Sequence, residues 1–288
     1  VLDTGGVVYG AGYADHFRVI HKRATTREQR DEFRGSKYVQ SDMGHVFCDV
    51  AEDLRAGKAV LFTGTPCQTS GLQSFLKLRR VSTDLLYVVD IVCHGVPGPY
   101  IWRDYLAYIE RKHGREIIAV DFRDKSKFGW SAHKESFNFG DRMLCNETFT
   151  YMFYQHIMFR HSCGQCHFTN FQRPSDITLA DFWGWQKVDE AFNADDKGCS
   201  LVLVNTEKGR KLFDRIKSKM DFRVSDKEAC IQPNLQHPSE IHPLRQSFEA
   251  DYARHGFLYV ARKYGDIGWR YKWEVLKRKC RTAKRLLF

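Results

Sequence analysis

Four cysteines occur in sequence contexts that suit the binding of a metal ion or an iron–sulfur cluster. Cys163 and Cys166 form the only C-x-x-C pair of the chain. Two thiolates at this spacing on a turn can hold one metal ion or part of a cluster. A lone C-x-x-C also occurs in redox pairs and in halves of zinc sites. The chemistry of this pair therefore depends on which elements bring further ligands to it.

Cys67 and Cys93 each follow an expected buried strand. The short apolar runs at 58–63 and 85–92 predict these two strands, and a helix is expected between them at 68–78. Parallel strands joined by a helix end at one edge of a sheet, and ligands collect at that edge. Cys67 and Cys93 should therefore lie side by side there. With the C-x-x-C pair they would make a four-thiolate site suited to zinc or an iron–sulfur cluster.

Strands and helices alternate along the chain, which predicts an α/β fold with a mixed sheet, flanking helices and a mostly helical C-terminal segment. We expect strands at 7–13, 17–21, 58–63, 85–92, 117–123, 135–139, 177–182 and 200–205. We expect helices at 25–34, 45–56, 68–78, 99–113, 149–160 and 208–219. From Ser239 onward the pattern is helical, with a break near 265–268.

The composition excludes several classes of protein. The chain has 288 residues, of which 43% are hydrophobic and 14% aromatic, so it is neither disordered nor collagen-like. No window approaches the roughly 18 apolar residues of a membrane span. No secretory signal begins at Val1. We therefore expect a cytoplasmic protein whose cysteines are not paired in disulfides.

The net charge of +10 is concentrated at the C-terminal end. Residues 269–288 hold eight Lys or Arg and one Glu, a net +7 that leaves only +3 for the rest of the chain. One interpretation is a solvated basic helix. The other is an acidic partner or an anionic membrane surface, with Trp269, Tyr271 and Trp273 as interfacial anchors. The nearly balanced remainder predicts no specific binding of nucleic acid.

The other five cysteines have no such context. A free cysteine behaves as a small buried hydrophobe, so we expect these residues to pack in the core. They are Cys48, Cys145, Cys199, Cys230 and Cys280.

Two glycine-containing segments are candidate cofactor contacts. The turn that contains Gly64 and Thr65 follows a strand and opens a helix, so its N–H groups could hold a phosphate or a flavin edge. It could equally be a plain strand-to-helix turn. In the segment 35–38, Lys37 could offer its charge to a phosphate or a reduced flavin, or it could be an ordinary solvated lysine.

Polar residues beside the proposed ligands have two interpretations as well. His94 and His167 could tune the site by donating hydrogen bonds to its ligands, or they could be partly buried polar residues. The acid and aromatics at 181–184 suit a cofactor wall, although an aromatic cluster is more often simply core.

Cys67 also allows a different hypothesis. A Pro-Cys-Gln at a strand-to-helix turn is similar to the nucleophile loop of cytosine-5 DNA methyltransferases, where the helix end favours the thiolate. Such enzymes also need a Gly-rich cofactor loop and a Glu-Asn-Val motif, and the sequence contains neither. The hypothesis leaves Cys93, Cys163 and Cys166 without a role, so we rank it third.

Several separated motifs, in the same order, resemble the coenzyme F-420 hydrogenase/dehydrogenase beta subunit family. The main ones are Gly-Thr-Pro-Cys-Gln at 64–68, Asp-Ile-Val-Cys-His-Gly-Val-Pro at 90–97, Ser-Cys-Gly-Gln-Cys-His-Phe at 162–168 and Ser-Asp-Ile-Thr-Leu-Ala-Asp-Phe-Trp-Gly at 175–184. Shorter matches are Gly-Gly-Val-Val-Tyr-Gly at 5–10, Gly-Ser-Lys-Tyr-Val at 35–39, Asp-Lys-Gly at 196–198 and Ser-Leu-Val-Leu-Val at 200–204. The resemblance covers about residues 5–206.

The resemblance implies an iron–sulfur flavoprotein. Its members relay electrons between a 4Fe-4S cluster and a deazaflavin, or another acceptor, through FAD. It implies an oxidoreductase domain at 1–235, followed by a helical basic extension at 236–288. By the resemblance the cluster ligands are Cys67, Cys93, Cys163 and Cys166. The implied FAD contacts are Gly35, Ser36, Lys37, Tyr38, Gly64 and Thr65.

The resemblance also implies an electron partner. Bacterial relatives often carry a two-cluster ferredoxin domain before this one, in polysaccharide biosynthesis contexts, so we expect a ferredoxin-like domain or protein as partner. Relatives have a Ser-Ser-Gly-Gly helix start upstream of the first strand, and this chain begins after that point. We therefore expect either a longer natural protein or flavin binding that is weaker or shared with another chain. The alternative function is a zinc-stabilised four-cysteine binding module without redox activity.

Overall fold

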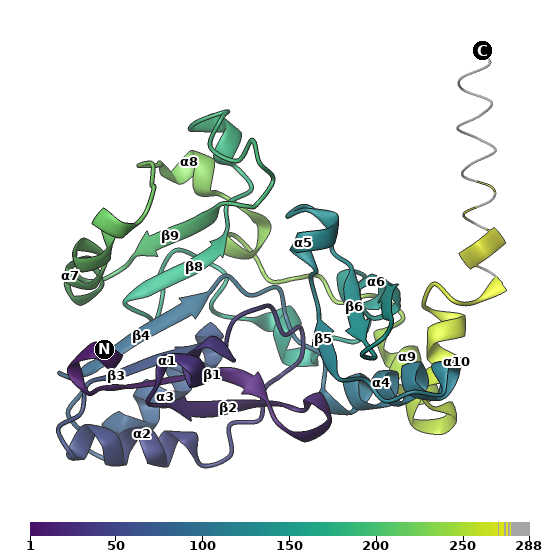
Figure 1. Cartoon of the computed structure of the whole chain (residues 1–288), viewed down its shortest axis with the longest axis horizontal. Coiled ribbons are helices and arrows are strands. Elements are labelled where there is room, and N and C mark those ends of the chain that lie inside the picture. Colours follow the sequence, from purple (N-terminus) through teal and green to yellow (C-terminus); the bar gives the residue numbers. More distant parts are fainter. Residues whose placement is uncertain (270, 274, 276, 278–288) are drawn as a thin grey trace.

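A six-stranded mixed sheet forms one half of the molecule (Figure 1). The computed structural model describes residues 1–269, 271–273, 275 and 277. The sheet order is β2-β1-β3-β4-β8-β9; the four inner strands are parallel, and the two edge strands are antiparallel to their neighbours. These strands are β1 (Val7–Tyr13), β2 (Val19–Ala24), β3 (Val60–Gly64), β4 (Leu86–Ile91), β8 (Ile177–Asp181) and β9 (Ser200–Val204).

Burial alternates along the central strands, because two helices cover one face of the first part of this sheet. Val60 and Phe62 of β3 are buried, as are Leu86 and Val88 of β4, which is the two-residue period of a strand with one covered face. These side chains share one core cluster with α2 (Val46–Arg55) and α3 (Pro66–Leu78).

The other half of the molecule is built around a small antiparallel sheet, β5-β6-β7, and four helices (Figure 1). Its core is largely aromatic and includes Trp102, Tyr105, Phe137 and Phe149, which lie in mutual ring contact. The elements are β5 (Ala119–Asp121), β6 (Glu135–Asn138), β7 (Met143–Asn146), α4 (Pro99–His113), α6 (Thr148–Tyr154), α9 (Arg245–His255) and α10 (Phe257–Lys263). Phe257 of α10 packs on Tyr105, so helix α10 belongs to this core.

Shorter helices connect these parts. The α-helices are α1 (Arg27–Asp31), α5 (Lys125–Phe128), α7 (Glu207–Ile216) and α8 (Lys227–Cys230). The 3-10 helices are Leu2–Thr4, Asp15–Phe17, His161–Gln165, Trp185–Lys187, Lys217–Lys219 and Pro233–Leu235. Among the described residues, no helix has both the length and the apolar character that a membrane crossing needs.

The predicted fold class is confirmed, and the differences are local. Helix α4 begins and ends at the predicted residues, since Pro99 suits its first turn and Gly114 its left-handed end. Helix α6 is shorter than the predicted 149–160, because His156 has a positive φ of 57° that ends the helical path. Strand β7 is absent from the predicted elements.

The packing prediction for the five remaining cysteines is correct in part. Cys199 and Cys230 are buried. Cys48 is exposed, because it lies away from the buried stripe of α2, and Cys145 is half-buried on the edge strand β7. Cys280 lies outside the described residues.

Glu135 is a carboxyl group buried in the aromatic core. It accepts hydrogen bonds from Tyr105 Oη at 2.7 Å, from the Phe149 N–H at 3.0 Å and from Thr150 Oγ1. Burial raises its pKa from 4.5 to about 7 despite these donors. The folded chain therefore binds this proton more tightly than the unfolded chain does.

Replacing Glu135 by glutamine is expected to change how stability depends on pH. The bound proton of Glu135 contributes fully to the free energy of unfolding at pH values below the pKa that Glu135 has in the unfolded chain. This contribution is lost as the pH rises through about 7, the pKa of Glu135 in the folded chain. The neutral amide carries no such titration, so Glu135→Gln should gain up to about 3 kcal/mol of unfolding free energy relative to wild type between about pH 5 and about pH 8. Urea unfolding at the two pH values measures this gain. An equal difference at both would contradict the assignment.

Candidate functional site

The register of β3 and β4 aligns two of the predicted cysteines. The strands are parallel, and Gly64 of β3 pairs with Asp90 of β4. Cys67 and Cys93 lie three residues beyond these paired positions, at the carboxyl edge of the sheet. Cys67 is in the first turn of α3, and Thr65 Oγ1 lies 3.2 Å from its Sγ. The prediction that strand order places these two cysteines at one edge agrees with this register.

The C-x-x-C segment reaches the same edge through contacts with the loop that follows Cys93. Pro97 and Phe159 form an isolated antiparallel bridge, and the Arg160 N–H donates to the Val96 carbonyl at 3.0 Å. Gly95 permits this approach: its φ is +134°, and a Cβ there would lie 2.5 Å from Phe159 Cδ2. Cys163 follows in the 3-10 turn His161–Gln165.

A buried ion pair fixes the segment that follows the C-x-x-C. Arg173 Nη2 lies 2.9 Å from Asp90 Oδ2, and the two side chains are 1% and 0% exposed. Arg173 also donates to the carbonyls of Ile91 and Phe168, and Thr178 Oγ1 donates to Asp90 Oδ1 at 2.5 Å. Because Ile91 precedes Cys93 and Phe168 follows Cys166, this network holds both cysteine-bearing segments together.

The four thiols interact electrostatically. Burial is the main cause that raises the pKa of the Cys93 thiol to about 12, and Cys67, Cys163 and Cys166 contribute to this rise. Burial, Cys67 and Cys166 also raise the pKa of Cys163. Such mutual effects require the sulfurs to be near one another, so the structure brings all four predicted ligands into one region.

Two backbone groups stabilise the thiolate forms. The backbone N–H of Gly95 lowers the pKa of Cys93, and the backbone N–H of Val96 lowers the pKa of Cys163. This lowering effect is smaller than the rise in pKa that burial causes, so both pKa values stay raised. A bound cation would favour the thiolate forms of Cys93 and Cys163, so these two thiols fit a metal ion or cluster. In the described part of the chain, no group of three or more His, Cys, Asp or Glu side chains is arranged to hold one metal ion.

The turn at Gly64 and Thr65 is tied to the start of α3. Thr65 is the N-cap, its N–H donates to Gln68 Oε1 at 3.0 Å, and Gln68 Nε2 donates to Ser41 Oγ at 2.8 Å. Pro66 has no N–H, so the turn keeps few backbone donors for a phosphate. Ser41 is three residues after Tyr38, so these hydrogen bonds also connect the turn to the second predicted cofactor segment.

The segment 35–38 follows α1, and the side chain of Lys37 is hydrogen-bonded to backbone carbonyls within and just before this segment. Lys37 Nζ donates to the carbonyls of Phe33, Arg34 and Gly35 at 3.3, 3.1 and 3.3 Å. Burial lowers the pKa of Lys37 to about 8. The interpretation of Lys37 as an ordinary solvated lysine is therefore wrong. Ser36 is half-buried, and the Tyr38 ring contacts Phe122 and Phe153.

The acidic and aromatic motif at 181–184 belongs to a larger group. Asp181 pairs with the buried Arg123 and accepts from Trp130 Nε1 at 3.0 Å. Trp183 is 41% exposed and stacks on Trp130 at 4.4 Å, so it forms a surface wall and not a core contact. Phe182 alone is buried. Sequence reasoning missed Arg123 and Trp130, because no local motif marks them and their partners lie more than 50 residues away.

His133 and Tyr154 extend this group. Tyr154 Oη lies 2.7 Å from His133 Nδ1, and the pKa of His133 falls to about 4 through burial and the charge of Arg123. His133 is therefore neutral at physiological pH. Neither residue was singled out from the sequence, since a lone His or Tyr carries no local signal.

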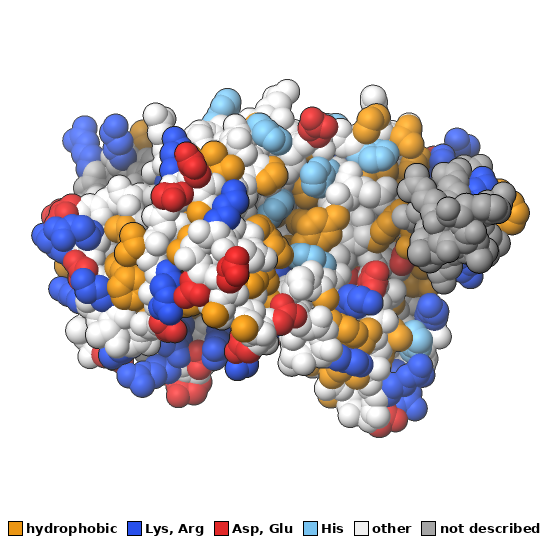
Figure 2. All heavy atoms as spheres, turned by 90° about the horizontal axis from the view of Figure 1, so that it is seen from above, with side chains coloured by type: hydrophobic (Ala, Val, Ile, Leu, Met, Phe, Trp, Pro, Cys, Tyr) orange, Lys and Arg blue, Asp and Glu red, His pale blue; other side chains and the backbone are white. Residues whose placement is uncertain are grey.

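A cavity of about 580 Å³ lies beside the C-x-x-C turn. Ile241 lines it, and a Cβ on Gly164 would lie 2.4 Å from Ile241 Cγ1, so the turn packs directly on the cavity wall. His94, Tyr154, His156 and Ser239 are among the other lining residues. Several histidines lie along one face of the molecule (Figure 2). His167, also predicted as a neighbour of the ligands, is exposed.

Comparisons with known proteins identify the family. The family that is described as the C terminus of the coenzyme F420 hydrogenase/dehydrogenase beta subunit matches residues 57–229, which is more than half of the chain. No curated protein gives a significant match.

Among solved structures, one similar chain comes from the xenon-derivatised F420-reducing [NiFe] hydrogenase complex of Methanosarcina barkeri. The two chains are 15% identical with a TM-score of 0.50, over 91% of this chain and 80% of that chain, so the likeness concerns the fold. The family description indicates an oxidoreductase role. On the match over 57–229, this chain belongs to the coenzyme F420 hydrogenase/dehydrogenase beta subunit family.

Proposed function

We propose that the chain is an iron–sulfur flavoprotein whose Cys67, Cys93, Cys163 and Cys166 bind a 4Fe-4S cluster. The observation that carries the proposal is geometric: the β3–β4 register brings Cys67 and Cys93 to one sheet edge, and the Pro97–Phe159 bridge joins the segment that leads to Cys163 and Cys166 to that edge. In a four-iron cluster each thiolate binds a different iron. A single zinc would need all four sulfurs at about 2.3 Å from one ion.

The protein groups around the cysteines would control how such a cluster is held. When bound, it would supply one-electron transfer between a flavin and an electron partner, for which we propose a ferredoxin-like domain or protein. The N–H groups of Gly95 and Val96 would stabilise negative charge on the sulfurs, and hydrogen bonds to sulfur tune the potentials of such groups. The Asp90–Arg173 ion pair would keep the two ligand segments in place.

For FAD we propose contacts with Gly35, Ser36, Lys37, Tyr38, Gly64 and Thr65. Because the Thr65 N–H is already bonded to Gln68, we assign Gly64 and Thr65 to the ring of a flavin and not to its phosphates. Lys37 is the cation of this set. Its lowered pKa leaves it mostly protonated at neutral pH, so its charge is available to a reduced flavin.

The cavity beside the C-x-x-C turn is our candidate entrance for an acceptor. Its walls combine an imidazole from His94 with a phenol from Tyr154, and both can donate hydrogen bonds to a polar ring. Ser239 Oγ donates to the His94 carbonyl at 2.5 Å and so holds this wall close to Cys93.

Metal and flavin analysis after anaerobic purification tests the proposal. We expect about four irons per chain, matching acid-labile sulfide and broad absorption in the visible range. Flavin released by denaturation should be identified as FAD by chromatography. One zinc per chain, with neither iron nor flavin, would support the binding-module alternative and overturn the redox function.

A further inference from the structure

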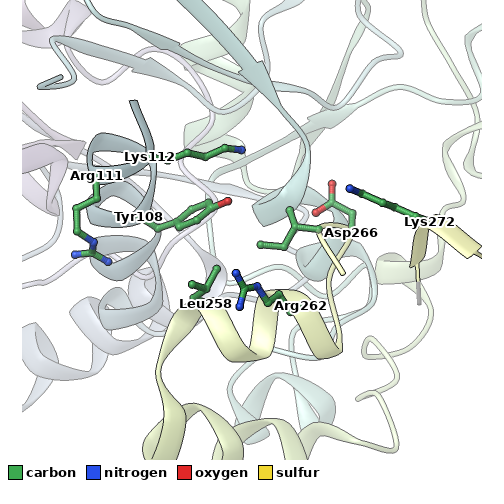
Figure 3. A pocket seen from close by; sticks show the side chains of 8 residues that line it. Tyr108, Arg111, Lys112, Leu258, Arg262, Asp266 and Lys272 are labelled. Atoms are coloured by element: carbon green, nitrogen blue, oxygen red, sulfur yellow. The ribbon is translucent and has the colours of Figure 1, made fainter. Parts of the chain in front are cut away.

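A basic cavity lies on the other half of the molecule, between the end of α4 and α10 (Figure 3). Its volume is about 670 Å³. Helix α4 contributes Tyr108, Arg111 and Lys112, whereas α10 contributes Leu258 and Arg262. The remaining lining residues follow α10 and include Asp266 and Lys272. The cavity therefore gathers four cationic side chains from two stretches of the chain that are far apart in sequence.

Ion pairs among the described residues do not neutralise the cations of the cavity. Elsewhere, exposed cations such as Arg210 and Lys217 pair with a neighbouring acid. The four cations of the cavity form no ion pair with any residue that the structure describes. Since four like charges around one space repel each other, an anion placed between them would be attracted.

The single acid of the cavity does not neutralise it. Asp266 Oδ1 is buried and has no hydrogen-bond partner among the described residues. One carboxylate offsets only one of the four cationic charges. The net charge of the cavity therefore stays positive.

Exposed apolar side chains lie next to this cavity along the chain. Trp269 and Trp273 are 74% and 53% exposed, and Lys272, which lines the cavity, is adjacent to Trp273. Leu258 and Tyr259 of α10 are also exposed. Basic residues combined with exposed Trp and Leu are typical of surfaces that lie in a lipid interface. The net charge of +7 in residues 269–288 adds attraction to an extended anionic surface.

We propose that this cavity binds the phosphate headgroup of an anionic lipid and thereby holds the C-terminal helices against a membrane surface. A soluble phosphate would use the four cations but would leave the tryptophans in water. A lipid surface uses both, and it also uses the charge of the final twenty residues. The inference does not depend on which cofactors the other half of the molecule binds.

Flotation of the full chain with lipid vesicles tests the proposal. We expect binding to vesicles of phosphatidylcholine with phosphatidylglycerol, and none to phosphatidylcholine alone. The pocket variant Lys112→Gln/Arg262→Gln should partition about tenfold or more weakly, since each basic residue near an anionic surface contributes to binding. The matched control is Lys211→Gln/Arg215→Gln, which removes the same charge from exposed positions of α7 and should behave like wild type. Circular dichroism melting shows that each variant is folded.

Several outcomes would overturn the proposal. Equal losses in the pocket variant and the control would mean that net charge alone drives binding. Binding to neutral vesicles would mean that the aromatic residues act without the cavity. Failure of the wild-type chain to bind anionic vesicles would also reject it. If calorimetry then detected inorganic phosphate in the cavity, the site would be one for a soluble anion.

Discussion

Cys93→Ser is expected to lose at least tenfold in bound iron and the matching sulfide, together with the visible absorption. Replacing even an outer residue of a metal site commonly costs about 10–100-fold in affinity, so loss of a ligand should cost no less. Cys93 is also the thiol on which the other three act. Iron and sulfide assays on anaerobically purified variants measure the effect. Cys67→Ser, Cys163→Ser and Cys166→Ser should each give the same result.

Cys48→Ser is the matched control for these variants. Cys48 is an exposed cysteine on α2 and belongs to no group of thiols in the described part of the structure. Its replacement should leave iron, sulfide and absorption unchanged. If Cys67→Ser and Cys93→Ser retained the metal content of wild type, the four-cysteine site would be wrong, whatever metal the protein contained.

Arg173→Met should lower the free energy of unfolding by about 3–5 kcal/mol. The substitution leaves Asp90, which is 0% exposed, as a carboxylate without its buried cation. It also removes the donors to the carbonyls of Ile91 and Phe168, which hold the two cysteine-bearing segments together. Urea unfolding at neutral pH, followed by circular dichroism, measures the loss.

Two comparisons show whether this loss comes from the buried charge. Arg210→Met breaks an exposed ion pair with Glu207 and should cost about 1 kcal/mol or less. Adding Asp90→Asn to Arg173→Met removes the unpaired charge, so part of the lost stability should return. A loss for Arg173→Met as small as that for Arg210→Met would show that the ion pair does not stabilise the fold.

The sequence alone determined those features that depend on neighbours along the chain. The short apolar runs at 58–63 and 85–92 predicted β3 and β4, and alternate residues of these runs face the core. Pro99 and Gly114 marked the two ends of α4. Cys67 and Cys93 could be grouped at this stage, since two parallel neighbouring strands end at one edge.

Only the tertiary structure decided the pairings between distant segments. Arg123 meets Asp181, and Arg173 meets Asp90, across 58 and 83 residues of chain. Neither partner has a local pattern that reveals the other, because each contact depends on how two separate elements pack. The basic cavity could not be predicted from the sequence for the same reason. The cations of α4 and those in and after α10 are far apart along the chain, and only packing places them around one space.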